Sequence, residues 1–322
     1  MPNWIITGII AGLTAAAMQS ALMALSPVSA VIFYLSPLPL FLAGFSRGWA
    51  SAALGTALMA VVLLVLVGSA KFALMAIISA GLAPVVASGL SMISRSAGTD
   101  SSEGEVRTNE REWYPEGRLV LWLALIAAIV TGISILAMGF DFAAYKAFIA
   151  SFIDPLIVAV EKQMPPGQPP FPKEFFTSMV ITALPVAASA IWLLATVTSM
   201  RFAIVFLTKI KRTVRPWAKF DQLAFPANSV IVLLACLLGS YFFSGMIQLL
   251  ALGAAGAFVS AFTILGLAIV HSLLGANAAR PLLLGLLYAS LFLFNWILAV
   301  PLTVLGLVDL NFNFRKSKSI KS

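Results

Sequence analysis

RLVLWLALIAAIVTGISILAMG, the sequence of residues 118–139, is apolar over nearly its whole length and holds a single charged residue, Arg118. A helix needs about 20 mostly apolar residues to cross the hydrocarbon core of a bilayer, which is about 30 Å thick. Inside lipid every backbone polar group must find its partner within the protein, and a helix achieves this by itself. This stretch therefore predicts a transmembrane helix.

The rest of the chain repeats the same pattern. Of its 322 residues, 61% are hydrophobic and 10% are charged, whereas a soluble domain has about 45–50% apolar and about 25% charged residues. We therefore predict an all-α fold, a polytopic transmembrane helix bundle of about eight or nine spans in a lipid bilayer. The other candidate spans are 4–25, 28–45, 48–67, 70–94, 175–207, 228–246, 247–274 and 281–307.

Residues 95–117 interrupt this pattern with Ser, Gly and mixed charge and without an apolar period. Such a composition is typical of a disordered linker, because it cannot bury enough apolar surface to offset the entropy of folding. The sequence thus predicts an N-terminal block of four helices over 1–94, a linker over 95–117 and a C-terminal block over 118–322.

A second interruption, residues 140–163, predicts an amphipathic helix lying along the membrane surface rather than crossing it. Its apolar side chains recur every four residues and its charged side chains lie on another face. The predicted apolar stripe is Phe148, Phe152, Leu156 and Val160, and the charged residues are Lys146, Asp154 and Glu161.

The loop 209–226 is the most basic internal segment. Cytoplasmic loops carry an excess of Lys and Arg, so we expect this loop and the linker 95–117 to be cytoplasmic, in the inner membrane of a bacterium. The net charge of +8 then reflects orientation and not a nucleic-acid partner. The basic residues of the loop are Lys209, Lys211, Arg212, Arg215 and Lys219.

The basic C-terminal tail conflicts with nine full spans, which would place it outside the cytoplasm. Two explanations are open. Either one of the last three segments does not cross, or the last segment is broken near Asn295 and Pro301 and turns back.

Gly8 and Gly12 form a GxxxG pair within the first candidate span. Small residues four positions apart let a second helix approach closely in a membrane. Such pairs also arise by chance in Gly/Ala-rich spans, so the pattern alone leaves the partner open.

No catalytic signature is visible, and neither an enzyme activity nor a cofactor or metal site is predicted. Candidate substrate-binding residues are the uncharged polar groups inside spans and two prolines that break the second span, since broken helices line substrate sites in transporters. Hydrogen bonds between helices, or a kink needed for packing, would explain the same residues. The candidates are Gln19, Tyr34, Pro37, Pro39 and Asn295.

Three motifs resemble the DUF2232 (YybS-like) family of bacterial membrane proteins: PLPLFLAG at 37–44, FDQLAFP at 220–226 and LGLVDLNFNFRK at 305–316. The linker 95–117 is longer than this resemblance implies. The N-terminal block is also distantly similar to the substrate-binding subunits of energy-coupling factor transporters. The resemblance implies a transport-like fold and no particular substrate.

Together these features predict a small-molecule transport component, either a permease or a substrate-binding subunit. Because no nucleotide-binding motif is present, ATP-driven transport would require a separate ATPase, and we expect Lys211, Arg212 and Arg215 to contact it. The alternative is a non-transporting scaffold for envelope or membrane-protein assembly, which would use the linker and the surface helix to bind other membrane proteins.

Overall fold

The computed structural model describes residues 2–96, 111–165, 171–275, 278–294 and 296–312, and these are almost entirely helical. Eight helical stretches among them are long and apolar enough to cross a membrane, and three shorter apolar helices accompany them. The protein is therefore a multi-pass membrane protein with an all-α fold, as the composition predicted.

The N-terminal block holds four of these stretches, each ending at a tight turn. Gly48 and Gly68 have φ angles of 96° and 69°, a region that residues with a Cβ atom avoid, and each ends a helix. Ser26 and Ser69 cap the helices that follow them. In chain order the elements are α1 (Asn3–Ser20), η1 (Ala21–Ala24), α2 (Pro27–Tyr34), α3 (Pro37–Arg47), α4 (Trp49–Val67), α5 (Ala70–Ala76), the π turn η2 (Ile77–Gly81) and α6 (Leu82–Ser91).

The second span is broken, as its prolines predicted. Helix α2 ends at Tyr34 and α3 begins at Pro37, with Leu35 and Ser36 between them. Pro37 has no N–H to donate to the preceding turn, so the chain changes direction before it. The side chain of Ser36 is fully buried at this break.

The GxxxG pair has a partner, helix α4. A Cβ atom built on Gly8 would lie 2.8 Å from the carbonyl oxygen of Ser51, and one built on Gly12 would lie 2.5 Å from that of Gly55. A step of four residues along α1, from Gly8 to Gly12, corresponds to a step of four residues in the same sense along α4, from Ser51 to Gly55. Helices α1 and α4 therefore run in the same direction. The predicted close approach of a second helix is confirmed.

The two ends of the predicted linker are folded. Strand β1 (Ser94–Ser96) pairs antiparallel with β2 (Arg111–Trp113), and Arg95 faces Glu112. Helix α7 then begins at Glu116. The middle of the linker, 97–110, lies outside the described residues.

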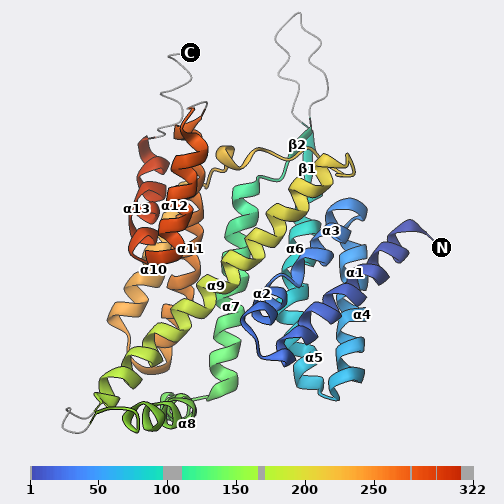
Figure 1. Cartoon of the computed structure of the whole chain (residues 1–322). Coiled ribbons are helices and arrows are strands. Elements are labelled where there is room, and N and C mark those ends of the chain that lie inside the picture. The colour runs from blue at the N-terminus through green and yellow to red at the C-terminus, as the bar shows by residue number, and fades with distance from the viewer. Residues whose placement is uncertain (1, 97–110, 166–170, 276–277, 295, 313–322) are drawn as a thin grey trace, which may run out of the picture.

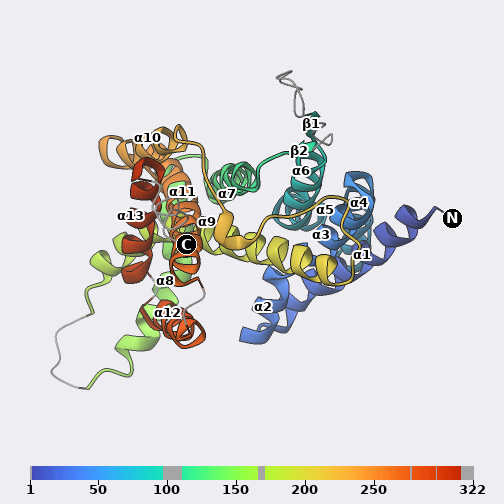
Figure 2. The ribbon, with the colours of Figure 1, turned by 90° about the horizontal axis from the view of Figure 1, so that it is seen from above.

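The C-terminal block is organised around one very long helix, α9. Its 37 residues correspond to about 55 Å, and it runs diagonally through the molecule from the end near α8 to the end that carries β1 and β2 (Figure 1). Seen from above, it reaches from the C-terminal helices across to the N-terminal block (Figure 2), where it contacts α3 and α2. The elements are α7 (Glu116–Met138), α8 (Phe142–Glu161), α9 (Lys173–Lys209), η3 (Phe220–Gln222), α10 (Ser229–Phe242), α11 (Gly245–Leu274), α12 (Arg280–Phe294) and α13 (Trp296–Phe312).

Helix α8 lies across one end of the bundle, at a large angle to α7 (Figure 1), which is the arrangement expected of a surface helix. The predicted stripe faces away from the bundle. Phe152 and Leu156 are 62% and 63% exposed, and Phe148 and Val160 are exposed as well. A second stripe with the same spacing packs against the bundle instead: Tyr145, Ile149, Ile153 and Ile157.

The last predicted span, 281–307, consists of two helices, α12 and α13, on either side of residue 295. The break that one of the two explanations for the basic tail requires is therefore present next to residue 295, whereas Pro301 lies inside α13. The tail itself lies outside the described residues. Helices α11 and α13 are in close contact, since the Thr263 and Thr303 hydroxyl oxygens lie 2.8 Å apart and a Cβ atom on Gly266 would collide with the Leu302 carbonyl oxygen. Thr303 also bonds to the carbonyls of Val259 and Ala299, so the two helices run in the same direction.

Candidate functional site

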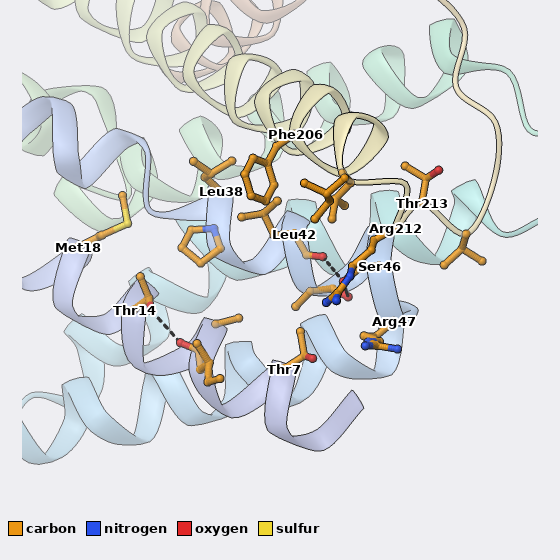
Figure 3. A pocket seen from close by; sticks show the side chains of 17 residues that line it. Thr7, Thr14, Met18, Leu38, Leu42, Ser46, Arg47, Phe206, Arg212 and Thr213 are labelled. Atoms are coloured by element: carbon orange, nitrogen blue, oxygen red, sulfur yellow. Dashed lines mark hydrogen bonds between the residues drawn. The ribbon is translucent and has the colours of Figure 1, made fainter. Parts of the chain in front are cut away.

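A groove of about 830 Å³, which we call the large groove, lies between α1, α3 and the C-terminal end of α9. Helix α3 forms its floor and the other two helices form its walls (Figure 3). The lining is Thr7, Ile10, Ala11, Thr14, Met18, Leu38, Pro39, Leu42, Ala43, Ser46, Arg47, Phe206, Leu207, Ile210, Arg212, Thr213 and Val214.

The charged groups of this groove gather at one end. Arg47, Ser46 and Arg212 lie together there, whereas Met18 lies at the other end (Figure 3). The hydroxyls of Ser46 and Thr14 donate to carbonyls of their own helices. Both arginines are exposed. In the described part of the chain, ion pairs join Lys173 to Asp154 and Arg201 to Glu116, and neither involves a groove arginine.

Three of the predicted substrate-binding residues come together elsewhere. Gln19, Tyr34 and Pro37 line a cavity of about 20 Å³ with Trp192. The Gln19 amide donates a 2.7 Å hydrogen bond to the Ser36 hydroxyl, and both side chains are buried. This cavity has room for about one water molecule. Gln19 thus makes a buried hydrogen bond between helices, one of the alternatives that the sequence left open, whereas Tyr34 is 37% exposed.

The other two candidates are not part of that cavity. Pro39 lies on the opposite side of α3 and lines the large groove. Asn295 lies outside the described residues, between α12 and α13. The groove itself was missed by the sequence analysis, because its lining is mostly Ala, Leu, Ile and Thr, which are the ordinary residues of membrane helices.

The loop between α9 and α10, residues 210–228, is a strap across one end of the molecule and contacts both blocks. The Val214 N–H donates to the Phe45 carbonyl at 3.4 Å, and the Trp217 ring lies 4.7 Å from the Phe45 ring. Farther along, Phe220 packs edge-on against His271. We call residues 210–228 the strap.

Arg215 holds the strap down. Its side chain is 5% exposed, donates to the carbonyls of Ser91 at 3.2 Å and Tyr114 at 2.7 Å, and stacks 3.9 Å from the Trp217 ring. Burial lowers the pKa of Arg215, and the negative charge of Glu116 opposes that shift. Of the three residues predicted to contact a partner ATPase, Arg215 is therefore buried, whereas Lys211 and Arg212 are exposed.

Beneath the strap lies an ion pair that the sequence analysis did not single out. The Arg201 guanidinium donates to the Glu116 carboxylate at 2.8 Å, and the Ala218 N–H of the strap donates to the other carboxylate oxygen at 2.7 Å. The side chains of Glu116 and Arg201 are only 8% and 20% exposed. The sequence indicates this pair only through the positions of its members: Arg201 lies near the end of one apolar run and Glu116 at the start of another.

A smaller groove of about 350 Å³ lies between α7 and α10. It is lined by Tyr114, Arg118 and Trp122 among mostly apolar residues. The Trp122 indole donates to the Tyr114 hydroxyl at 3.0 Å, which suits an aromatic pair at a membrane–water interface. This groove carries one cation, whereas the large groove carries two.

Replacing Gly117 with Ala tests how tightly the strap is seated. The new Cβ atom would collide with the Ala224 carbonyl oxygen, so the strap must move, at a cost of about 1–3 kcal/mol. We expect faster trypsin cleavage at Lys219 in purified G117A protein than in the unchanged protein. Gly89→Ala is the control, since its Cβ atom would have its nearest neighbour at 3.9 Å. Equal cleavage of both variants would contradict the tight seating.

The fold and the groove define a multi-pass membrane protein with a cavity that opens between its helices. Comparison with protein-family models, with curated proteins and with solved structures finds no match. Within the described ranges, no three His, Cys, Asp or Glu side chains lie close enough together to hold a metal ion.

Proposed function

We propose that this protein is the membrane-embedded component of a small-molecule transport system and that the large groove is its substrate site. The groove carries the proposal, because its volume of about 830 Å³ falls in the usual range of small-molecule sites, about 300–1,000 Å³. The resemblance to the DUF2232 family and to substrate-binding subunits of transporters points the same way, as a prediction.

The connection between the blocks supports this proposal. One wall of the groove is α1, from the N-terminal block, and the other is α9, which packs on α11 and α7. A relative movement of the two blocks would therefore widen or narrow the groove, as transporters require when one bundle moves against another. The broken segment between α2 and α3 lies beside it.

We propose further that the end with the strap faces the cytoplasm of a bacterium and that α8 faces the opposite side of its inner membrane. The strap end is rich in cations, which the positive-inside rule favours, whereas the α8 end mixes acids and bases. The cations at the strap end are Arg47, Arg95, Arg111, Arg118, Lys209, Lys211, Arg212, Arg215 and Lys219.

Cysteine labelling tests this orientation. Cys236 is the single cysteine, so Cys236→Ser gives a background for Lys146→Cys in α8 and Lys219→Cys in the strap, both at exposed positions. In intact cells whose outer envelope is permeable to the reagent, we expect a membrane-impermeant maleimide to label K146C at once and K219C only after the inner membrane is opened. The reverse order would mean that the orientation is inverted.

A scaffold that organises other membrane proteins is the second candidate. The observation that favours it is the exposed stripe of α8, in which Phe152 and Leu156 point away from the bundle. Lipid at the membrane surface would cover such a stripe as well. The scaffold predicts that polar replacements on this stripe abolish function while changes in the groove have no effect.

Affinity capture in mild detergent distinguishes the two candidates. If transport is driven by ATP, we expect the tagged protein to retain an ABC-type ATPase, and Lys211→Ala with Arg212→Ala to lose it. Arg95→Ala with Arg111→Ala is the control, because it removes the same charge from the β1–β2 hairpin at the same end. Arg215 is left unchanged, because it is buried and its replacement could release the ATPase through misfolding instead of through a lost contact. Capture of envelope-assembly proteins without an ATPase would favour the scaffold.

A further inference from the structure

The large groove has the position and length of one lipid chain. Its lining on α1 extends from Thr7 to Met18, which corresponds to about 16 Å along the helix, or about half of the 30 Å hydrocarbon core. The strap-side end of the groove lies where α3 ends at Arg47, and from there it runs along α1 to Met18, in the second half of the Asn3–Ala24 stretch. Its length is therefore close to the thickness of one leaflet.

The lining follows the polarity of a lipid. Ile10, Leu42 and Phe206 provide apolar walls along most of the groove, and a water-soluble ion would lose its hydration there without gaining partners. At the strap end, Arg47, Arg212 and Thr213 bring charge and a hydroxyl together (Figure 3). A ligand that fits both parts has an anionic head and an apolar tail.

The two cations are arginines, which favours a particular head group. A guanidinium presents several N–H donors in a planar fork that matches two oxygens of a phosphate, whereas a lysine offers a point charge. Neither arginine takes part in an ion pair of the described residues. Their charge is therefore available to an incoming anion.

We propose that the groove binds an anionic glycerophospholipid from the leaflet on the strap side. The phosphate lies between Arg47 and Arg212, and one acyl chain lies along α1 and α9 down to Met18. The inference builds on the proposed function, because it assigns a substrate class to the same groove, and an amphiphile can enter this groove sideways from the bilayer.

Lipid binding by the purified full-length protein tests the inference. We would measure, by native mass spectrometry from detergent, the binding of phosphatidylglycerol and of phosphatidylcholine with the same acyl chains. We expect the unchanged protein to bind phosphatidylglycerol more tightly. The double variant Arg47→Gln with Arg212→Gln should bind this lipid about tenfold more weakly, since each cation near the membrane surface contributes to the affinity for an anionic lipid. Phosphatidylcholine carries the same phosphate with a compensating choline cation, so its binding should weaken less and the preference for phosphatidylglycerol should be lost.

Two further variants make the result specific. Arg95→Gln with Arg111→Gln removes the same charge from the β1–β2 hairpin and should leave the preference intact. Thr14→Trp fills the groove from an exposed position and should weaken both lipids. Equal binding of the two lipids, or equal loss in both arginine double variants, would overturn the inference. A groove occupied by a partner's helix would give the first of these results.

This test can fail separately from that of the proposed function. Capture of an ATPase together with equal binding of the two lipids would leave a transport component whose substrate is not an anionic lipid, and would refute the inference alone. Selective lipid binding without an ATPase would support the inference and refute the ATP-driven form of the proposed function.

Discussion

Replacing Arg201 with Ala should lower the free energy of unfolding by about 3 kcal/mol, at the lower end of the range for breaking a buried ion pair. The change leaves the Glu116 carboxylate, which is 8% exposed, without its nearest countercharge. It also removes the guanidinium that lies 5.4 Å from the Phe220 ring of the strap. The strap would then lose its Phe220 contact, and the carboxylate that accepts from its Ala218 N–H would lose its countercharge.

The midpoint of thermal unfolding in detergent, followed by size-exclusion chromatography, measures this effect. A loss of about 3 kcal/mol should lower the midpoint by about 6–12 °C. Lys209→Ala, at an exposed position of the same helix, is the matched control and should change it little. Adding Glu116→Gln to R201A should restore part of the loss, because it removes the unpaired charge. A midpoint for R201A equal to that of the control would show that the pair contributes no stability.

Replacing Gly266 with Leu should lower the free energy of unfolding at least as much as Arg201→Ala does. A Cβ atom at this position would already collide with the carbonyl oxygen of Leu302 on α13, and a Cβ atom built on the matching Gly306 would lie 2.6 Å from the Phe262 carbonyl oxygen. Backbone cannot give way as a flexible side chain can, so α11 and α13 must separate and the Thr263–Thr303 contact must break. We expect a loss of at least about 3 kcal/mol, at the upper end of the usual overpacking range.

Gly285→Leu is the control for this variant, because a Cβ atom there would meet no atom within 4 Å. Both variants add the same side chain to a membrane helix, so any difference between them reports the helix contact. We expect G285L to elute as a single species with an unchanged unfolding midpoint, whereas G266L is aggregated or melts at a clearly lower temperature. Equal stability of the two would mean that α13 packs on α11 more loosely than the structure describes.

The two predictions concern different ways of joining helices. Glycine contacts hold pairs of helices that run in the same direction, α1 with α4 in one block and α11 with α13 in the other. Helix α9 and the strap join the blocks to each other. Changes in the glycine pairs should therefore unfold a block, whereas changes under the strap should first loosen the connection on which the groove depends.

One sequence signal for the α11–α13 pair was overlooked. The pentapeptides TILGL at 263–267 and TVLGL at 303–307 differ at one position, and in the structure their threonines and glycines meet. A search for short internal repeats would have found them. It would not have shown that the two copies pack on each other.

The sequence by itself determined the membrane character, the span positions and the breaks at Pro37 and near residue 295. These depend on local properties, since the length of an apolar run is compared with a bilayer of known thickness and Pro37 has no N–H to donate to the preceding turn. The predicted spans accordingly agree with the observed helices to within a few residues at most ends.

Only the tertiary structure decided which side chains are buried and which share a cavity. Helix α8 has two apolar stripes with the same spacing, and only its packing selects the one that contains Tyr145. Arg215 looks like its exposed neighbours in sequence, yet it is buried on the carbonyl of Ser91, 124 residues away. The physical reason is the same in both cases: burial and hydrogen bonding depend on partners that are distant along the chain, and local composition carries no record of them.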